Sequence, residues 1–261
     1  MLFRFKPEFP VIEFDTLSNS NFCEKIESCQ RHIREINNNL KKYVTGGKPY
    51  RKQVISAILP VPLSLVDYVK RMRKIHKGNA VREVKKADKK KYYCEVFHMQ
   101  NHVEDLVEIN HSKEIRQGRK MTKSYQKDIK DYGGFPVDLQ PVESPECSVH
   151  FSQWMGVFKP MEGHKQGTLL VGKKLVAYIN LIRHGEIILY GSILGHGDFL
   201  NDGIMYLLNH RTIEWVLTPD IQDNQGIKYI MYAGWFDGTE GLQKWKKRTL
   251  FQPYYLKLAI Q

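Results

Sequence analysis

The order of elements predicted over residues 167–255 is the feature that most constrains the fold of this chain. Hydrophobic patterning predicts strands over 175–182 and 187–194, a helix over 201–217, a strand over 227–235, a helix over 241–248 and a last strand over 251–258. The first two strands are almost entirely apolar, which is typical of strands buried on both faces. Buried strands that alternate with helices in this way predict an α+β fold.

Upstream of this region, strands are predicted over 92–99 and 150–159, with two helices between them. Asn101 is placed to cap the first helix, which continues through Ile109. The second helix covers 121–132 and ends at two glycines. These elements define a domain over residues 91–261.

Residues 1–90 differ in character, and we expect a basic, partly helical N-terminal extension. Helices are predicted over 24–43 and over 65–77, where Ser64 is a suitable N-cap. A run of charged residues over 82–91 marks the expected boundary with the domain.

Positive charge is concentrated in residues 41–90. This segment holds fifteen lysines and arginines against three acids, which accounts for the net charge of +12 of the whole chain. Such a segment indicates an anionic partner, either tRNA or DNA or, less readily, a membrane surface. The expected contacts are Lys70, Arg71, Arg73 and Lys74. The alternative is a basic surface that only keeps the protein soluble.

Composition argues against several classes of protein. No apolar run reaches the ~18–20 residues of a membrane span, and the N-terminus lacks a secretory signal. The four cysteines include no CxxC pair and are too few for a disulfide framework, so we expect a reduced, cytoplasmic location. No metal is expected, because neither candidate group has a convincing ligand spacing, whether Cys94 with His98 and His102 or Cys23 and Cys29 with His32.

Three segments carry a family resemblance over residues 90–261. They are Val96-Phe97-His98-Met99 with Val103-Glu104-Asp105-Leu106, Lys174-Leu175-Val176-Ala177-Tyr178, and Gly241 to Arg248 with Phe251-Gln252-Pro253. In this order they resemble the first strand and helix, the third strand, and the last helix and strand of the GNAT superfamily of acyl-CoA-dependent N-acyltransferases. The resemblance implies a mixed, mostly antiparallel twisted sheet flanked by helices, with acyl-CoA, above all acetyl-CoA, as cofactor. The ending also resembles the Fem-type and leucyl/arginyl-transferase relatives, which use aminoacyl-tRNA.

The resemblance places a cofactor loop between the strand over 187–194 and the helix over 201–217. Backbone N–H groups of such a loop hold a pyrophosphate at the helix N-terminus. The residues implied are Leu194, Gly195, Gly197, Asn201 and Gly203. The loop departs from the family pattern, because a basic first residue is missing and Asp198 and Asp202 would repel a pyrophosphate.

In this fold the reaction takes place where the fourth and fifth strands separate. His196 is the expected general base, Asp198 would orient or replace it, and Tyr232 would be the acid. The alternatives are a turn role for His196 and a capping role for Asp198. Residues expected to meet the substrate are Arg116, Arg119, Trp235 and Asp237.

The functional hypothesis is therefore an N-acyltransferase that moves an acyl group from acyl-CoA to an amine. Two alternatives keep the enzyme class, an aminoacyl-tRNA-dependent transferase and a phage-type enzyme that modifies DNA bases. A third alternative is a non-catalytic nucleic-acid-binding module with the same fold.

Overall fold

The structure is a computed structural model, and it describes residues 9–18, 23, 27, 29–31, 34, 40, 43–44, 54–116, 118–218 and 224–259. Most of the helix predicted over 24–43 lies outside the described residues. Within them, no helix combines the length and the apolar character needed to cross a bilayer.

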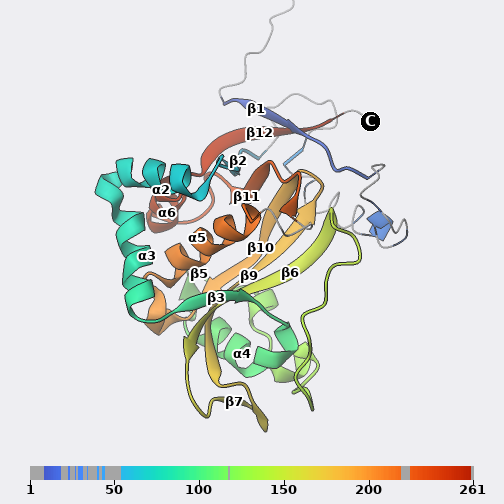
Figure 1. Ribbon diagram of the computed structural model, residues 1–261, viewed down its shortest axis with the longest axis vertical. Helices are drawn as coiled ribbons and strands as arrows, with labels where there is room; N and C mark the ends of the chain where they lie inside the picture. The colour runs from blue at the N-terminus through green and yellow to red at the C-terminus, as the bar shows by residue number, and fades with distance from the viewer. Residues whose placement is uncertain are drawn as a thin grey trace, which may run out of the picture.

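One large sheet forms the centre of the described part of the chain (Figure 1). Its strands lie in the order β1 (Val11–Phe14), β12 (Gln252–Leu258), β2 (Ser56–Pro60), β11 (Tyr229–Gly234), β10 (Ile187–Gly195), β9 (Lys173–His184), β6 (His150–Pro160) and β3 (Tyr93–Val96). The pairs β1–β12 and β10–β11 are parallel, and the other neighbours are antiparallel. The predicted α+β fold with a mixed, mostly antiparallel sheet is confirmed.

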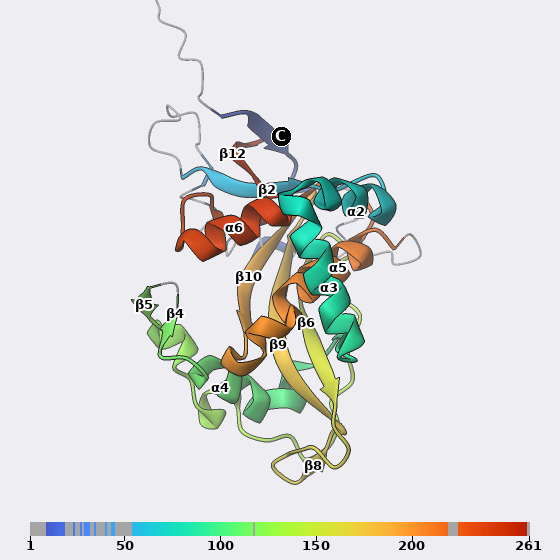
Figure 2. The same cartoon turned by 90° about the vertical axis from the view of Figure 1, so that its left-hand side faces the viewer.

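Helices pack on both faces of this sheet (Figures 1 and 2). One core joins the sheet to α2 (Leu65–Lys74), α3 (Asn79–Lys89), α5 (Ile204–Val216) and α6 (Glu240–Arg248), and a second core joins it to α4 (Val103–His111). Short 3-10 turns are η2 (His76–Gly78), η3 (Met99–His102), η4 (Lys123–Tyr125), η5 (Ile129–Tyr132) and η6 (Gly197–Asp202). Two small hairpins pair β4 (Ile115–Arg116) with β5 (Arg119–Lys120) and β7 (Lys165–Gln166) with β8 (Leu169–Leu170).

Strand β2 lies inside the sheet, although it comes from the segment predicted as an extension. It pairs antiparallel with β11 on one side and with β12 on the other. Its residues Ala57, Ile58 and Leu59 are fully buried. Residues 54–60 therefore share the sheet and the core of the domain predicted over 91–261.

The charged run over 82–91, expected to mark a domain boundary, forms most of α3. Ala80, Val84 and Ala87 recur with helical spacing and are buried in the core shared with α5. The run is thus the solvent-facing side of an amphipathic helix. In α2, Ser64 Oγ accepts a hydrogen bond from the N–H of Asp67 at 3.1 Å, which confirms the predicted cap.

Two local predictions are wrong. The helix expected over 121–132 is two separate turns, η4 and η5, because Asp128 starts a new turn with its own capping box. Asn101 does not cap α4, since its side chain bonds the backbone of Gln140. The N–H groups in the first turn of α4 donate instead to Oε1 of Gln166.

The feature that positions the site is the separation of β10 from β11. The two strands pair from Ile187 to Leu189 and then diverge. A register irregularity between Tyr190 and Ile193 interrupts β10 on its other side, and Ala233 in β11 has a positive φ of 47°. Beyond Leu189 the two strand edges therefore face each other across a gap instead of pairing.

Candidate functional site

A cleft with two adjacent chambers lies where β10 and β11 separate. The apolar chamber has a volume of about 390 Å³ and is lined by Lys113, Ile115, Arg116, Ile193, Leu194, Gly195, Leu200, Met205, Tyr232, Gly241, Leu242 and Trp245. The polar chamber has a volume of about 580 Å³ and is lined by Arg116, Lys120, Met121, Thr122, Tyr125, Tyr190, Gly191, Ile193, Leu194, Tyr232, Ala233, Phe236, Asp237, Gly238 and Thr239. The four residues common to both are Arg116, Ile193, Leu194 and Tyr232, so the chambers meet at the diverging strands. These volumes suit a small molecule or the end of a larger one.

Arg116 lines both chambers and ties α4 to the end of β10. Its guanidinium donates to the carbonyl groups of Gly195 and Ile109, both at 2.9 Å, and to Ser112 Oγ at 2.7 Å. Burial lowers the pKa of Arg116 from its ordinary value. Since these bonds already fix the guanidinium, its first role is to hold the cleft wall. Arg119, predicted beside it, pairs with Arg116 in the β4–β5 hairpin.

Tyr232 occupies the junction of the two chambers within an aromatic cluster. Its ring centroid lies 5.5 Å from that of Trp245, 6.1 Å from that of Tyr190 and 6.2 Å from that of Phe251. Packing of this kind holds the ring in one orientation. The cleft thus contains a phenol group, which can donate or accept a proton, at the position where the acid was predicted.

Lys246 supports the part of the cleft wall that is formed by the turn after β11. Its side chain is fully buried, and Nζ donates to the carbonyl groups of Gly234 at 2.6 Å, Trp235 at 3.1 Å and Asp237 at 2.8 Å. Burial lowers the pKa of Lys246 to about 8. The ammonium group therefore fixes the turn that follows β11 and, with it, the rim of the polar chamber.

His196 and Asp198 line neither chamber, although they were predicted as the base and its partner. His196 caps η6, because Nδ1 accepts the N–H of Asp198 at 3.2 Å. Nε2 must then carry the proton, and it lies 3.2 Å from Oε1 of Glu108. The carboxylate of Asp198 is exposed. This geometry matches the turn role given as the alternative for His196, but the cap is the His196 side chain and not Asp198. We assign neither residue a part in the cleft.

Protein groups already bind the loop predicted to hold a pyrophosphate. The N–H of Gly197 donates to Ser112 Oγ at 2.9 Å, and the N–H of Asp198 is taken by His196. Lys86 of α3 donates to the carbonyl group of Asn201. The N–H groups of Gly197, a predicted donor, and of Asp198 therefore face Ser112 and His196 instead of a ligand.

Gly203 brings this loop into direct contact with α3. Its φ is +83°, and a Cβ atom there would lie 2.2 Å from the carbonyl oxygen of Glu83. Nearby, the Tyr92 hydroxyl donates to the carboxylate of Asp202 at 2.8 Å. Of the residues predicted to hold the cofactor, Leu194 and Gly195 line the cleft, whereas Gly197, Asn201 and Gly203 serve the packing of α3 and α4.

Trp235 and Asp237, the two substrate contacts predicted at the end of β11, have different surroundings in the structure. Asp237 lines the polar chamber, and its carboxylate accepts the N–H of Gly234 at 2.9 Å. Trp235 is buried in the core, and its backbone N–H donates to the carbonyl group of Ile55. Trp235 is therefore a packing residue, whereas Asp237 offers the cleft a carboxylate.

Sequence reasoning missed Ser112 and Lys246, which hold the cleft walls. Ser112 follows α4 in a segment without a pattern, so nothing in the sequence marks it. Lys246 carries a usable signal, because it lies four residues after Leu242 on the same stripe of α6 as Thr249. A lysine on a buried stripe needs acceptors, and the glycine-rich turn after β11 supplies them.

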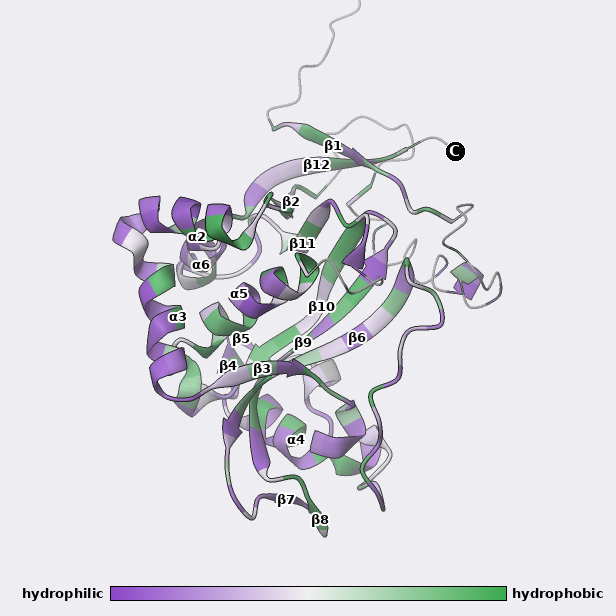
Figure 3. Cartoon of the chain, in the orientation of Figure 1, coloured by the Kyte–Doolittle hydropathy of each residue, from purple (hydrophilic) through white to green (hydrophobic). Residues whose placement is uncertain are grey.

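Exposed cations gather on α2 and α3, two helices that carry many hydrophilic residues (Figure 3); this set is called the α2–α3 face. Its exposed cations are Lys70, Arg73, Lys74, Lys77, Arg82, Lys85, Lys86, Lys89 and Lys90. The four on α3 and Lys90, which follows the helix, line a surface groove. Arg71, also predicted as a contact, is half-buried and lies 3.8 Å from Asp67.

The architecture and the diverging strands define a GNAT-like fold. No family model and no curated protein matches the sequence. Among solved structures the chain is similar to FemX, with a TM-score of 0.50 and 12% identity over 85% of this chain and 66% of that chain.

Two further structures are similar to this chain. They are the C-terminal domain of a lysylphosphatidylglycerol synthetase from Agrobacterium fabrum and L-PGS from Bacillus licheniformis, with TM-scores of 0.42 and 0.41 and 11% identity, each over 77% of this chain and 58% of that chain. The chain thus spans less than two thirds of the length of these three proteins. At such identities the likeness to FemX shows the fold alone.

Proposed function

We propose that the chain is a GNAT-like N-acyltransferase whose acyl donor is an aminoacyl-tRNA. The acceptor amine attacks the ester carbonyl of the donor, the C–N bond forms, and the C–O bond to the ribose breaks. The amine loses a proton, and the ribose oxygen leaves as a hydroxyl group.

The choice of donor rests on the loop between β10 and α5, called the occupied loop because protein groups already bind its N–H groups. Acyl-CoA, expected from the family resemblance, would need backbone N–H groups for its pyrophosphate. Here Gly197 and Asp198 donate to protein acceptors, and Gly203 is covered by α3. An aminoacyl-tRNA places its phosphates elsewhere and presents only its acylated end to the cleft, so it does not need this loop. The sequence resemblance to Fem-type transferases supports the same donor.

The cleft supplies two groups suited to the proton transfers. Tyr232 lies between the chambers and would protonate the ribose oxygen as it leaves. Asp237, the carboxylate among the lining residues, would accept a proton from the amine. The apolar chamber would hold the side chain of the aminoacyl group, because aliphatic and aromatic residues form most of its wall.

Replacing Tyr232 with phenylalanine should lower the rate of acyl transfer about 100-fold, because one general acid is removed while the ring packing stays. The measurement uses total tRNA charged with ¹⁴C-labelled amino acids and a low-molecular-weight cell extract as the source of amines. Tyr254→Phe is the matched control, because Tyr254 lies in β12 and lines neither chamber. Equal rates for the two variants would remove Tyr232 from the mechanism. Absence of transfer by the wild-type protein would favour a non-catalytic binding module.

The basic α2–α3 face supports tRNA as the donor carrier. Changing Lys85 and Lys89 to glutamate should weaken tRNA binding at least tenfold near 100 mM salt and flatten the salt dependence of the affinity. The control changes Lys130 and Lys165, two exposed lysines outside this face, by the same total charge. Fluorescence anisotropy with labelled tRNA measures both. Equal losses in the two variants would reject the face as a specific contact, and equal affinity for duplex DNA would point to DNA as the partner.

A further inference from the structure

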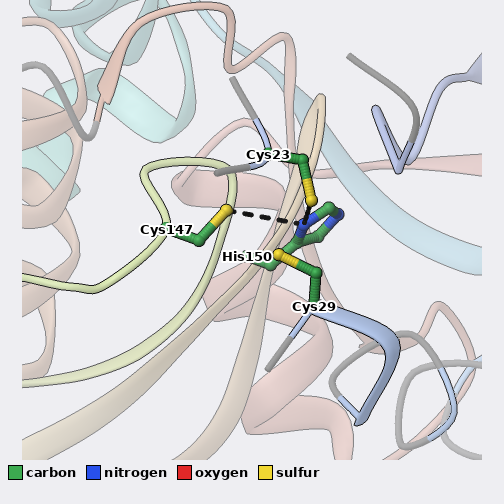
Figure 4. Close-up of side chains that lie close together, drawn as sticks. All are labelled: Cys23, Cys29, Cys147 and His150. Atoms are coloured by element: carbon green, nitrogen blue, oxygen red, sulfur yellow. Dashed lines mark hydrogen bonds between the residues drawn. The ribbon is translucent and has the colours of Figure 1, made fainter. Parts of the chain in front are cut away.

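Three cysteines and one histidine converge at a place far from the cleft (Figure 4). The four residues are Cys23, Cys29, Cys147 and His150, and their ligand atoms all lie within 4.8 Å of one another. No other group of this kind occurs among the described residues. Cys29, Cys147 and His150 are buried, and Cys23 is half-buried. Side chains that only fill space have no need to bring all their sulfur and nitrogen atoms to one point.

The imidazole of His150 is oriented for metal binding. Its Nε2 lies 2.7 Å from the carbonyl oxygen of Thr16, which can only accept, so Nε2 carries the proton. Nδ1 then has a lone pair, and it points at the sulfur atoms. A histidine ligand whose second nitrogen donates to a backbone carbonyl is the usual arrangement at metal centres.

The distances agree with a tetrahedral centre. Both Cys23 Sγ and Cys147 Sγ lie 3.7 Å from His150 Nδ1. Bond lengths of about 2.3 Å for Zn–S and about 2.0 Å for Zn–N give an S···N edge of roughly 3.5 Å in a tetrahedron. One cation at this place could be bound by all four ligand atoms at the same time.

We propose that Cys23, Cys29, Cys147 and His150 bind one Zn²⁺ ion. Three thiolates and one imidazole are a soft ligand set that favours zinc over Mg²⁺ or Ca²⁺. Four protein ligands leave no open position for substrate, so the site is structural. It ties the N-terminal segment to the start of β6.

The site and the cleft are independent of each other. His150 pairs with His184 at one end of β9, whereas Gly195 at the cleft pairs with Ala177, roughly 20 Å away along the strand. The zinc proposal therefore stands or falls separately from the proposed transferase activity.

Element analysis of the full chain tests the proposal. Protein produced in zinc-supplemented medium and dialysed against metal-free buffer should contain about one zinc per chain by inductively coupled plasma mass spectrometry. Cys147→Ser and His150→Gln should each lower the zinc content at least tenfold, because each removes one of the four ligands. Cys94→Ser is the control, since Cys94 lies in β3 outside the cluster and the variant should keep its zinc. Wild-type protein with less than a tenth of one zinc per chain would overturn the proposal, as would variants that keep their zinc.

A second measurement does not depend on the folding of the variants. Wild-type protein stripped of metal and titrated with Co²⁺ should show the intense visible bands and the sulfur-to-cobalt charge-transfer band of a tetrahedral thiolate site, with saturation at one ion per chain. A spectrum of hexa-aqua Co²⁺ throughout the titration would overturn the proposal. So would a disulfide between any two of the three cysteines in the freshly purified protein.

Discussion

Substituting alanine for Gly203 should lower the free energy of unfolding by about 3 kcal/mol, because two penalties add. A residue with a Cβ atom in the left-handed region costs about 1–2 kcal/mol. In addition, the Cβ atom would lie 2.2 Å from the carbonyl oxygen of Glu83 and 2.8 Å from its carbon, so α3 must move away from the loop. Overpacking of this kind costs about 1–3 kcal/mol.

Gly172→Ala separates the two penalties. Gly172 also has a positive φ, +65°, but a Cβ atom there meets nothing within 4 Å. Its substitution should therefore cost about 1 kcal/mol, the backbone penalty alone. Urea unfolding followed by circular dichroism measures both variants. Equal losses would mean that α3 does not pack closely against Gly203, and would contradict the closure of the loop over residues 195–203 by α3.

Replacing Lys246 with methionine should lower the free energy of unfolding by about 3 kcal/mol and also reduce acyl transfer. Methionine fills a similar volume but leaves the carbonyl groups of Gly234, Trp235 and Asp237 without their donor. Each buried polar group left without a partner costs about 1–3 kcal/mol. Because Asp237 is one of the three and lines the polar chamber, the turn and the Asp237 carboxylate should also lose their position.

Lys247→Met is the control for this substitution, because Lys247 is the exposed neighbour in α6 and should change stability by less than about 0.5 kcal/mol. The pH dependence gives an independent readout. Burial lowers the pKa of Lys246 from 10.5 to about 8, so between these values the unfolded chain binds more protons than the native protein. The contribution of Lys246 to stability therefore rises with pH from about 8 to about 10.5 in the wild type and is absent in Lys246→Met. Parallel pH profiles for the two proteins would contradict the buried ammonium group.

The fold could be predicted where local pattern decides structure. The apolar runs that become β9 and β10 and the Ser64 cap of α2 are signals carried by neighbouring residues. The position of β2 could not be predicted, because its partners β11 and β12 lie far away in sequence and strand pairing leaves no local mark. The helical spacing of the apolar residues Ala80, Val84 and Ala87 in α3 was present in the sequence. It was overlooked because most of the residues between them are charged.

The site, like the fold, could be predicted only in part. Leu194, Gly195 and Tyr232 were predicted at the cleft from their positions near the ends of two neighbouring strands. The prediction succeeds because residues beyond the point where two such strands separate face the space between them. The role of His196 could not be read from its position, since it depends on which ring nitrogen faces the backbone N–H of Asp198. Of the cysteine–histidine cluster, only Cys23 and Cys29 could be considered together from the sequence, where His32 was their expected partner. Cys147 and His150 could not be joined to them, because the two halves meet only where β6 lies beside the N-terminal segment.

The most direct test of the proposed donor is a competition between two labelled donors in one reaction. Wild-type protein receives ¹⁴C-acetyl-CoA and ³H-aminoacyl-tRNA at equal concentrations, with the same extract of small amines, and the products are separated from both donors. We expect a product that carries ³H and no ¹⁴C above the level of a protein-free control. A product labelled with ¹⁴C would contradict it, because acetyl-CoA would then be used despite the occupied loop.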